Sequence, residues 1–167
     1  MTTFLLRKLA LFLLLMASPA LAHADIGDTM TELRARYGSA KDMSGQMLFE
    51  VRLKDGQLVP ARDAPNPQEH FTITVYFDGD RSAMEVITRN TTDPVKANLS
   101  QDDIQQLLSA TSNGMTWVPF QAHDGKPTWL RRQSRDNAQR LLARFEASAG
   151  DKSEDGPVLL IMLYTEK

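Results

Sequence analysis

The sequence predicts an α+β protein in which short helices pack on an antiparallel β-sheet. Several segments alternate apolar and polar residues at the period of a strand, and two Asp-Gly pairs stand where such segments meet. Two other segments begin with a capping-box pattern and carry apolar residues at helical spacing. Cysteine is absent, so disulfides cannot link these elements and packing must stabilise them.

The chain begins like an exported protein. A basic start and an apolar run, Leu9 to Ala17, precede a small-x-small motif that ends at Ala24. These are the regions of a secretory signal peptide, and the run is shorter than the about 20 residues of a spanning helix. We expect cleavage after Ala24 to remove 1–24. The remaining 25–167 is then a single periplasmic or secreted α+β domain without a transmembrane segment.

The stretch IGDTMTELRARYG predicts a short helix over 29–37. Thr29 and Glu32 have capping-box spacing, and Gly38 is placed to end the helix. The apolar residues expected to share its buried face are Met30, Leu33 and Tyr37.

Strands are predicted next, over 46–53, 71–77 and 81–89, because apolar residues alternate with polar ones in each. Asp55-Gly56 and Asp78-Gly79 are preferred hairpin turns, so neighbouring strands should pair antiparallel. The intervening 61–70 and 90–98 are expected to be loops.

A second helix is predicted over 101–112, with Ser100 as N-cap, Asp103 completing the capping box and Asn113-Gly114 as the stop. The segment MTWVPF predicts a short strand that Pro119 confines to a sheet edge. A turn over 123–127 and a strand over 128–132 follow.

Two interpretations are open for 136–148, where the apolar residues fit a helical stripe and also alternate like a strand. We favour a strand that pairs with 157–165. The helix-then-strands order then occurs twice, which suggests two αββββ-like halves, 25–90 and 99–167.

The opening stretch resembles the signature of the small outer-membrane-assembly lipoproteins of the SmpA/OmlA type, in the residues Gly27, Thr29, Glu32, Leu33, Tyr37 and Gly38. The resemblance implies a short helical segment packed on a small antiparallel sheet. That plan is shared with β-lactamase-inhibitor-like proteins, which carry two copies of it. The lipoproteins are anchored through an acylated cysteine, which this chain lacks. The chain also resembles small exported bacterial proteins with a Gly-Asp-Thr helix, a Leu-Ser helix and a later Trp.

No catalytic, cofactor-binding or metal-ligating residue is predicted. A zinc site needs three or four ligands at close spacing, and the neighbourhoods of His70 and His123 do not supply them, so both are interpreted as solvated turn residues. Asp78-Gly79-Asp80 lacks the later ligands of a calcium loop. No nucleophile elbow, phosphate loop or dinucleotide fingerprint is present.

Trp117 and Trp129 allow two interpretations. They can fill the space between the second helix and the sheet, as large aromatics do in small cores. Alternatively, one of them is an exposed anchor for a protein partner. The net charge of −2 gives no electrostatic basis for binding nucleic acid.

The leading functional hypothesis is therefore a non-catalytic exported protein that binds another envelope or secreted protein through its sheet face or helices. A carboxylate-based hydrolase and an inhibitor of a secreted enzyme are the alternatives. The inhibitor hypothesis predicts a concave sheet surface with exposed aromatic side chains.

Overall fold

The structure, a computed structural model, describes residues 26–61, 70–90, 98–132, 139–147 and 157–164. The predicted signal peptide and most of the two predicted loops lie outside these residues. The helices are α2 (Met30–Tyr37) and α3 (Gln101–Ala110). The strands are β1 (Ala40–Met43), β2 (Gln46–Lys54), β3 (Gln57–Pro60), β4 (His70–Asp78), β5 (Arg81–Arg89), β6 (Val118–Gln121), β7 (Pro127–Arg132), β8 (Arg140–Glu146) and β9 (Val158–Tyr164).

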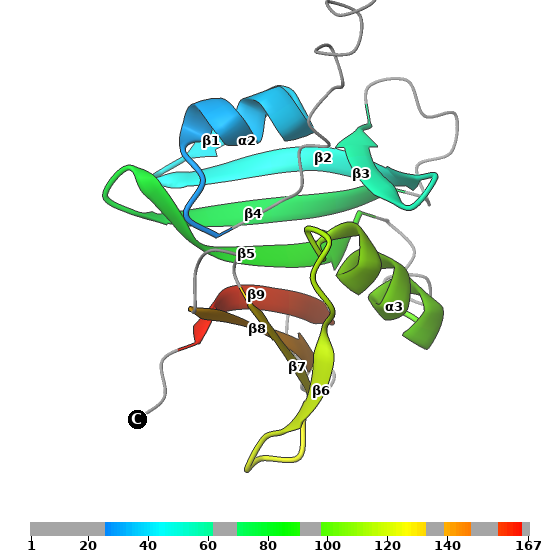
Figure 1. Cartoon of the computed structure of the whole chain (residues 1–167). Coiled ribbons are helices and arrows are strands. Elements are labelled where there is room, and N and C mark those ends of the chain that lie inside the picture. Colours follow the sequence, from blue (N-terminus) through cyan, green and yellow to red (C-terminus); the bar gives the residue numbers. More distant parts are fainter. Residues whose placement is uncertain (1–25, 62–69, 91–97, 133–138, 148–156, 165–167) are drawn as a thin grey trace, which may run out of the picture.

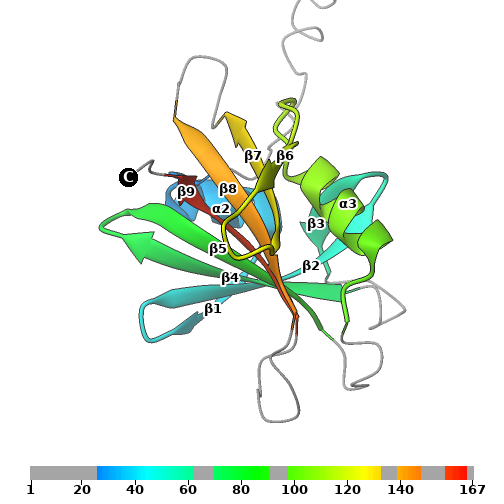
Figure 2. The ribbon, with the colours of Figure 1, turned by 90° about the horizontal axis from the view of Figure 1, so that it is seen from below.

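The described strands form one antiparallel sheet with the order β1-β2-β4-β5-β9-β8-β7-β6, and β3 pairs with β2 beside β1 (Figure 1). Pairing of β5 with β9 joins the strands that follow α2 to those that follow α3. Seen from below, β8 crosses the direction of β4 and β1 (Figure 2), so the sheet twists strongly. The predicted α+β class is confirmed, with the sheet as its larger part.

Both helices begin as their sequences predict. The Thr29 hydroxyl accepts from the Glu32 N–H (3.3 Å), and the Glu32 carboxylate accepts from the Thr29 N–H (2.7 Å). Ser100 and Asp103 form the same pair of bonds at the start of α3. One part of the α2 prediction is wrong: Met30 is 37% exposed, while Leu33 and Tyr37 are buried. Met30 is the first helical residue, where the turn faces solvent.

The second helix is shorter than predicted and ends at its C-cap Thr111. The Thr111 hydroxyl donates to the Leu107 carbonyl (2.8 Å), which satisfies a backbone acceptor at the helix end. Asn113 and Gly114 have positive φ values and form the turn after it.

The predicted strands 46–53, 71–77, 81–89, 128–132 and 157–165 are confirmed within one or two residues, whereas the strand predicted in MTWVPF (115–120) begins only at Val118. Asp55 (φ 51°) and Gly56 (φ 74°) both have the positive φ that a type I′ hairpin requires. The ambiguous segment 136–148 contains strand β8, which pairs with β7 on one side and β9 on the other. The helix interpretation is therefore wrong there. The reason is non-local, because partners on both sides satisfy its backbone groups.

The hydrophobic core lies between the two helices and one face of the sheet, which we call the core face. Alternate residues of β2, β4, β8 and β9 supply most of the sheet side, and both helices cover it with buried apolar side chains. The fully buried apolar side chains include Leu33, Tyr37, Phe49, Val51, Ile73, Val75, Ile87, Leu107, Leu141 and Leu159.

Candidate functional site

The sheet face opposite the core, which we call the open face, carries no described helix. Its residues alternate with the core residues along each strand, so the register identifies them. Cα partners place apolar side chains in one row across the sheet, interrupted only by Gln46. This apolar row is Val118, Leu130, Leu142, Met162, Met84, Tyr76 and Met43.

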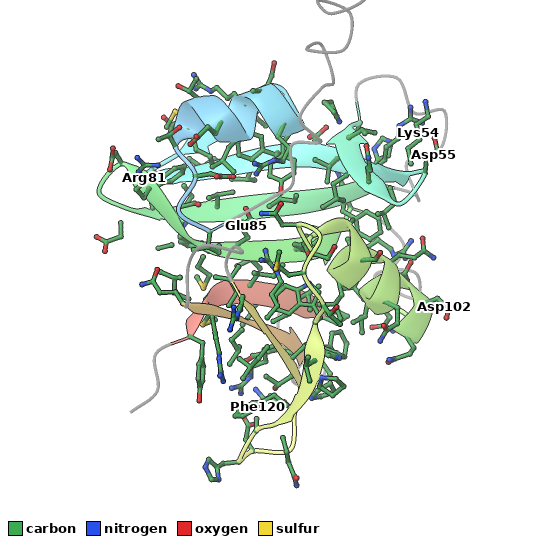
Figure 3. The ribbon with its side chains drawn as sticks, viewed as in Figure 1. Lys54, Asp55, Arg81, Glu85, Asp102 and Phe120 are labelled. Atoms are coloured by element: carbon green, nitrogen blue, oxygen red, sulfur yellow. The ribbon has the colours of Figure 1, made fainter. Side chains whose placement is uncertain are left out.

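The open face is concave where β6 to β9 meet. Phe120 on β6 is in register with Leu160 on β9, so on a flat sheet Tyr164 would lie about 14 Å away across the strands and about 13 Å further along them. The ring centroids of Phe120 and Tyr164 are only 5.9 Å apart, in an edge-to-face contact. This concave curvature of the sheet also explains why Thr128 and Leu130 are buried on a face that no described helix covers. Figure 3 shows Phe120 on the opposite side of the molecule from α2.

Over β7 and β8 and the turn before them, the charged residues of the open face fall into two groups. Arg144 contacts two carboxylates, Asp124 and Glu146, the latter at 3.0 Å from its Nε. The Lys126 N–H bond and the nearby Arg144 hold the pKa of Asp124 below its usual value. By contrast, Arg132 and Arg140 face each other across β7 and β8, and both are exposed. We call these two residues the arginine pair.

The two predicted partner-contact residues lie beside a groove between α3 and the β6–β7 hairpin. Trp129 is 8% exposed and belongs to the core, whereas Trp117 is partly buried and packs against it. Both line a cavity of about 380 Å³, together with Leu108 and Pro119. The Arg131 guanidinium lies 5.0 Å from the centroid of the Trp117 ring. Their placement agrees with the packing interpretation, and Trp117 retains some exposure.

A buried charged cluster lies under α2, where sequence analysis predicted no polar core residue. Arg36 and Asp28 form an ion pair with a 2.5 Å N–O distance. Glu85, which Figure 3 labels on β5, is 1% exposed. The Ser82 N–H donates to the Asp28 carbonyl (2.9 Å), which fixes the segment before α2 against β5. The sequence offers a weak signal for this cluster, since Glu85 stands between apolar residues in a strand.

Electrostatics within this cluster favour a structural role. Burial and the negative charge of Glu85 raise the pKa of Tyr37 well above its usual value. Burial alone would lower the pKa of Arg36, but Tyr37, Asp28 and Glu85 outweigh it and the pKa is raised. A hydrolytic carboxylate pair must face a cleft that substrate can enter. Glu85 is shielded from solvent and does not meet this requirement.

The two described histidines lie in different elements. His123 is exposed in the turn after β6, as predicted. His70, predicted as a solvated turn residue, is instead the first residue of β4, half-buried opposite Arg52. The difference arises because β4 starts one residue earlier than its apolar pattern. Across the described ranges, no group of three or more His, Asp or Glu side chains is arranged to hold a metal ion.

Sequence analysis considered binding through a sheet face but did not identify the residues of the open face, although β9 carried a signal for them. The stretch VLLIMLY is apolar on both faces of its strand, which indicates that both faces meet apolar surroundings. No protein-family model, no curated protein and no solved structure matches the chain. Among the described residues, no helix has the length and apolar character needed to span a membrane.

Proposed function

We propose that this protein is an exported, non-catalytic module that binds another envelope or secreted protein through the open face of its sheet. The observation that carries the proposal is the apolar row. Its two ends, Val118 and Met43, are exposed, Leu130 is buried and the other members are half-buried. Apolar side chains that reach solvent in a continuous row are typical of interaction surfaces. The concave face with Phe120 and Tyr164 supplies the curved surface and the aromatic groups that such sites favour.

Two features of the sequence support export and the architecture behind this proposal. The first 24 residues have the composition of a signal peptide, which would direct 25–167 to the periplasm or the exterior. In the described residues α2 is followed by five strands and α3 by four, so the predicted four-strand plan fits only the second half. The shared order of a helix followed by strands supports an interpretation as two related halves. The resemblance to β-lactamase-inhibitor-like proteins, which carry two copies of this plan, is consistent with a binding role; it is an analogy of fold.

The test is crosslinking in the periplasm followed by isolation of the full chain. Val118 and Phe120 are 57% and 37% exposed on the open face. Their double substitution Val118→Ser/Phe120→Ser removes apolar contact area with little disturbance of the core. The matched control is Met30→Ser/Leu163→Ser, because these residues are 37% and 39% exposed and lie off the open face.

We expect one partner to be crosslinked to the wild type and to the control, and to be lost from the open-face variant. Thermal unfolding of both variants checks that they remain folded. Equal capture by all three proteins, or no enrichment over an unrelated periplasmic protein, would overturn the proposal.

A further inference from the structure

We propose that the arginine pair, Arg132 and Arg140, is the binding site for carboxylates of an acidic, extended segment of the partner protein. This inference rests on the proposed function and names the chemistry of the partner. The site consists of the two guanidinium groups and the apolar and aromatic side chains next to them on the open face.

The arginine pair is distinguished from the other arginines of the described residues by its pairing, because Arg132 and Arg140 are direct cross-strand partners. Lack of an ion pair alone does not distinguish it, since Arg34 and Arg52 also form none with a described residue. Four others form ion pairs with acidic side chains: Arg36, Arg81, Arg89 and Arg144. Arg132 and Arg140 form no ion pair with any residue that the structure describes, and they are direct cross-strand partners. Like charges directly opposite each other destabilise a sheet. A bound carboxylate would remove this repulsion and gain charge-assisted hydrogen bonds from the guanidinium groups.

The surroundings of the arginine pair specify more than negative charge. Tyr164 is the cross-strand partner of Arg140, and its ring contacts Phe120. Leu142 and Met162 of the apolar row are two residues further along the same strands, on the same face. Two residues of a strand span about 7 Å. This is the distance between side chains i and i+2 of an extended chain, so the site fits a segment in which acidic and apolar residues alternate on one face.

The observations favour a protein segment over a membrane or a nucleic acid. The open face is concave at β6 to β9, so a flat bilayer surface cannot contact the apolar row and the arginine pair together. Binding of a nucleic acid backbone uses a stripe of basic residues. Here the basic charge is local, since Arg144 at the other end of β8 is neutralised by Asp124 and Glu146, and the whole chain has a net charge of −2.

The probe is a peptide of sequence Ser-Glu-Ser-Leu-Ser-Glu-Ser, capped at both ends, titrated into the isotope-labelled chain and followed by NMR. The matched probe has Gln in place of Glu. The test variant is Arg132→Gln/Arg140→Gln. Its control is Arg34→Gln/Lys54→Gln, which removes the same charge from two exposed residues of α2 and the end of β2. Phosphatidylglycerol vesicles and a short single-stranded DNA are titrated in parallel.

We expect the acidic peptide to shift resonances of β7, β8 and β9, and the Gln peptide to bind more weakly. Loss of the arginine pair should weaken binding of the acidic peptide about fivefold or more, in the range expected for two exposed charge contacts. The control should change it less than twofold, and added salt should weaken the wild-type complex.

Equal binding of the two peptides, or unchanged binding to the Arg132→Gln/Arg140→Gln variant, would overturn this inference. Preferential binding of the vesicles or the DNA at the arginine pair would assign it to that class of ligand and would also overturn it. The proposed function fails separately. If the Val118→Ser/Phe120→Ser variant loses the crosslinked partner while the arginine variant keeps it, the open face binds a partner and only the acidic chemistry is wrong.

Discussion

The region that begins with α2 (26–90) and the region that begins with α3 (98–164) start alike and then diverge. Each opens with a capping box and a short helix on the core face. The α2 region buries charge beneath its helix, with Asp28, Arg36 and Glu85 shielded from solvent. In the α3 region, by contrast, the distinctive side chains are accessible to solvent: those of the edge strand β6, the arginine pair and the groove beside Trp117. Under the proposed function, the first region would then mainly support the fold, and the second would supply most of the partner contacts.

The largest difference in stability between the two regions should appear when the same Phe→Ala substitution is made in both. Phe49 is fully buried, with its ring 5.4 Å from that of Tyr37, while Phe120 is 37% exposed. We expect Phe49→Ala to lower the free energy of unfolding by about 3–5 kcal/mol. Phe120→Ala should cost about 1 kcal/mol, the value of its aromatic contact with Tyr164. Urea denaturation measures both, and equal losses would contradict the division into a supporting and a recognising region.

The second-largest difference in stability between the regions is expected from their ion pairs. Asp28→Asn leaves Arg36, whose side chain is 9% exposed, without its carboxylate, and should cost about 2 kcal/mol, the penalty for a buried polar group left unsatisfied. Asp124→Asn should cost less than about 1 kcal/mol, because Asp124 is 41% exposed and Glu146 still holds Arg144.

A double-mutant cycle separates the interaction energy of Asp28 and Arg36 from the cost of leaving one of them buried without its partner. The variant Asp28→Asn/Arg36→Met removes both charges, so it should lose less stability than the two single variants added together. Additive losses would show that Asp28 and Arg36 act independently.

The helix caps should show where the regions remain alike. Thr29→Ala and Ser100→Ala each remove the acceptor for an N–H of the first turn and should each cost about 1 kcal/mol. Thermal unfolding monitored by circular dichroism gives both values. If one of the two substitutions leaves the stability unchanged, packing and not the cap determines where that helix begins.

Acid should weaken the α3 region through Asp103. Partial burial would raise the pKa of Asp103, but hydrogen bonds from Ser100 and Arg89 outweigh it and lower the pKa below its usual value. A lowered folded pKa adds stability that is present above the unfolded pKa, near 4, and is lost as the pH falls through the folded value.

The matched variant for this acid dependence is Arg89→Gln, which removes one cause of the lowered pKa. It should lose less stability than the wild type when urea midpoints are compared between about pH 5 and about pH 2. An identical acid-induced loss in the two proteins would exclude Asp103 as a contributor.

The smallest effect, and the only gain, is expected from the arginine pair. Arg132→Gln/Arg140→Gln removes a like-charge pair directly opposite across two strands, and should stabilise the protein by about 0.2–0.5 kcal/mol. The Arg34→Gln/Lys54→Gln control should leave the urea midpoint unchanged. A loss of stability in the arginine variant would mean that these side chains serve the fold and not a ligand.

Local chemistry in the sequence determined most of the elements. Both helix starts depend on side chains three residues apart, and the Asp55-Gly56 hairpin depends on two adjacent residues with positive φ, so a single segment contains all the information. The alternation in 71–77 likewise fixed which side chains enter the core, because a strand exposes them to two faces in turn.

Only the tertiary structure decided the features that depend on pairing between distant segments. β8 is a strand because β7 and β9 flank it, and Glu85 is buried because pairing with β4 aligns it with Val75 on the core face. The same pairing turns Met84 to the open face, where register with Met162 and Leu142 builds the apolar row. The arginine pair arises in the same way, since Arg132 and Arg140 become neighbours through the register of β7 and β8. Hydrogen bonds between strands set that register, and they join residues whose closeness no local pattern of the sequence encodes.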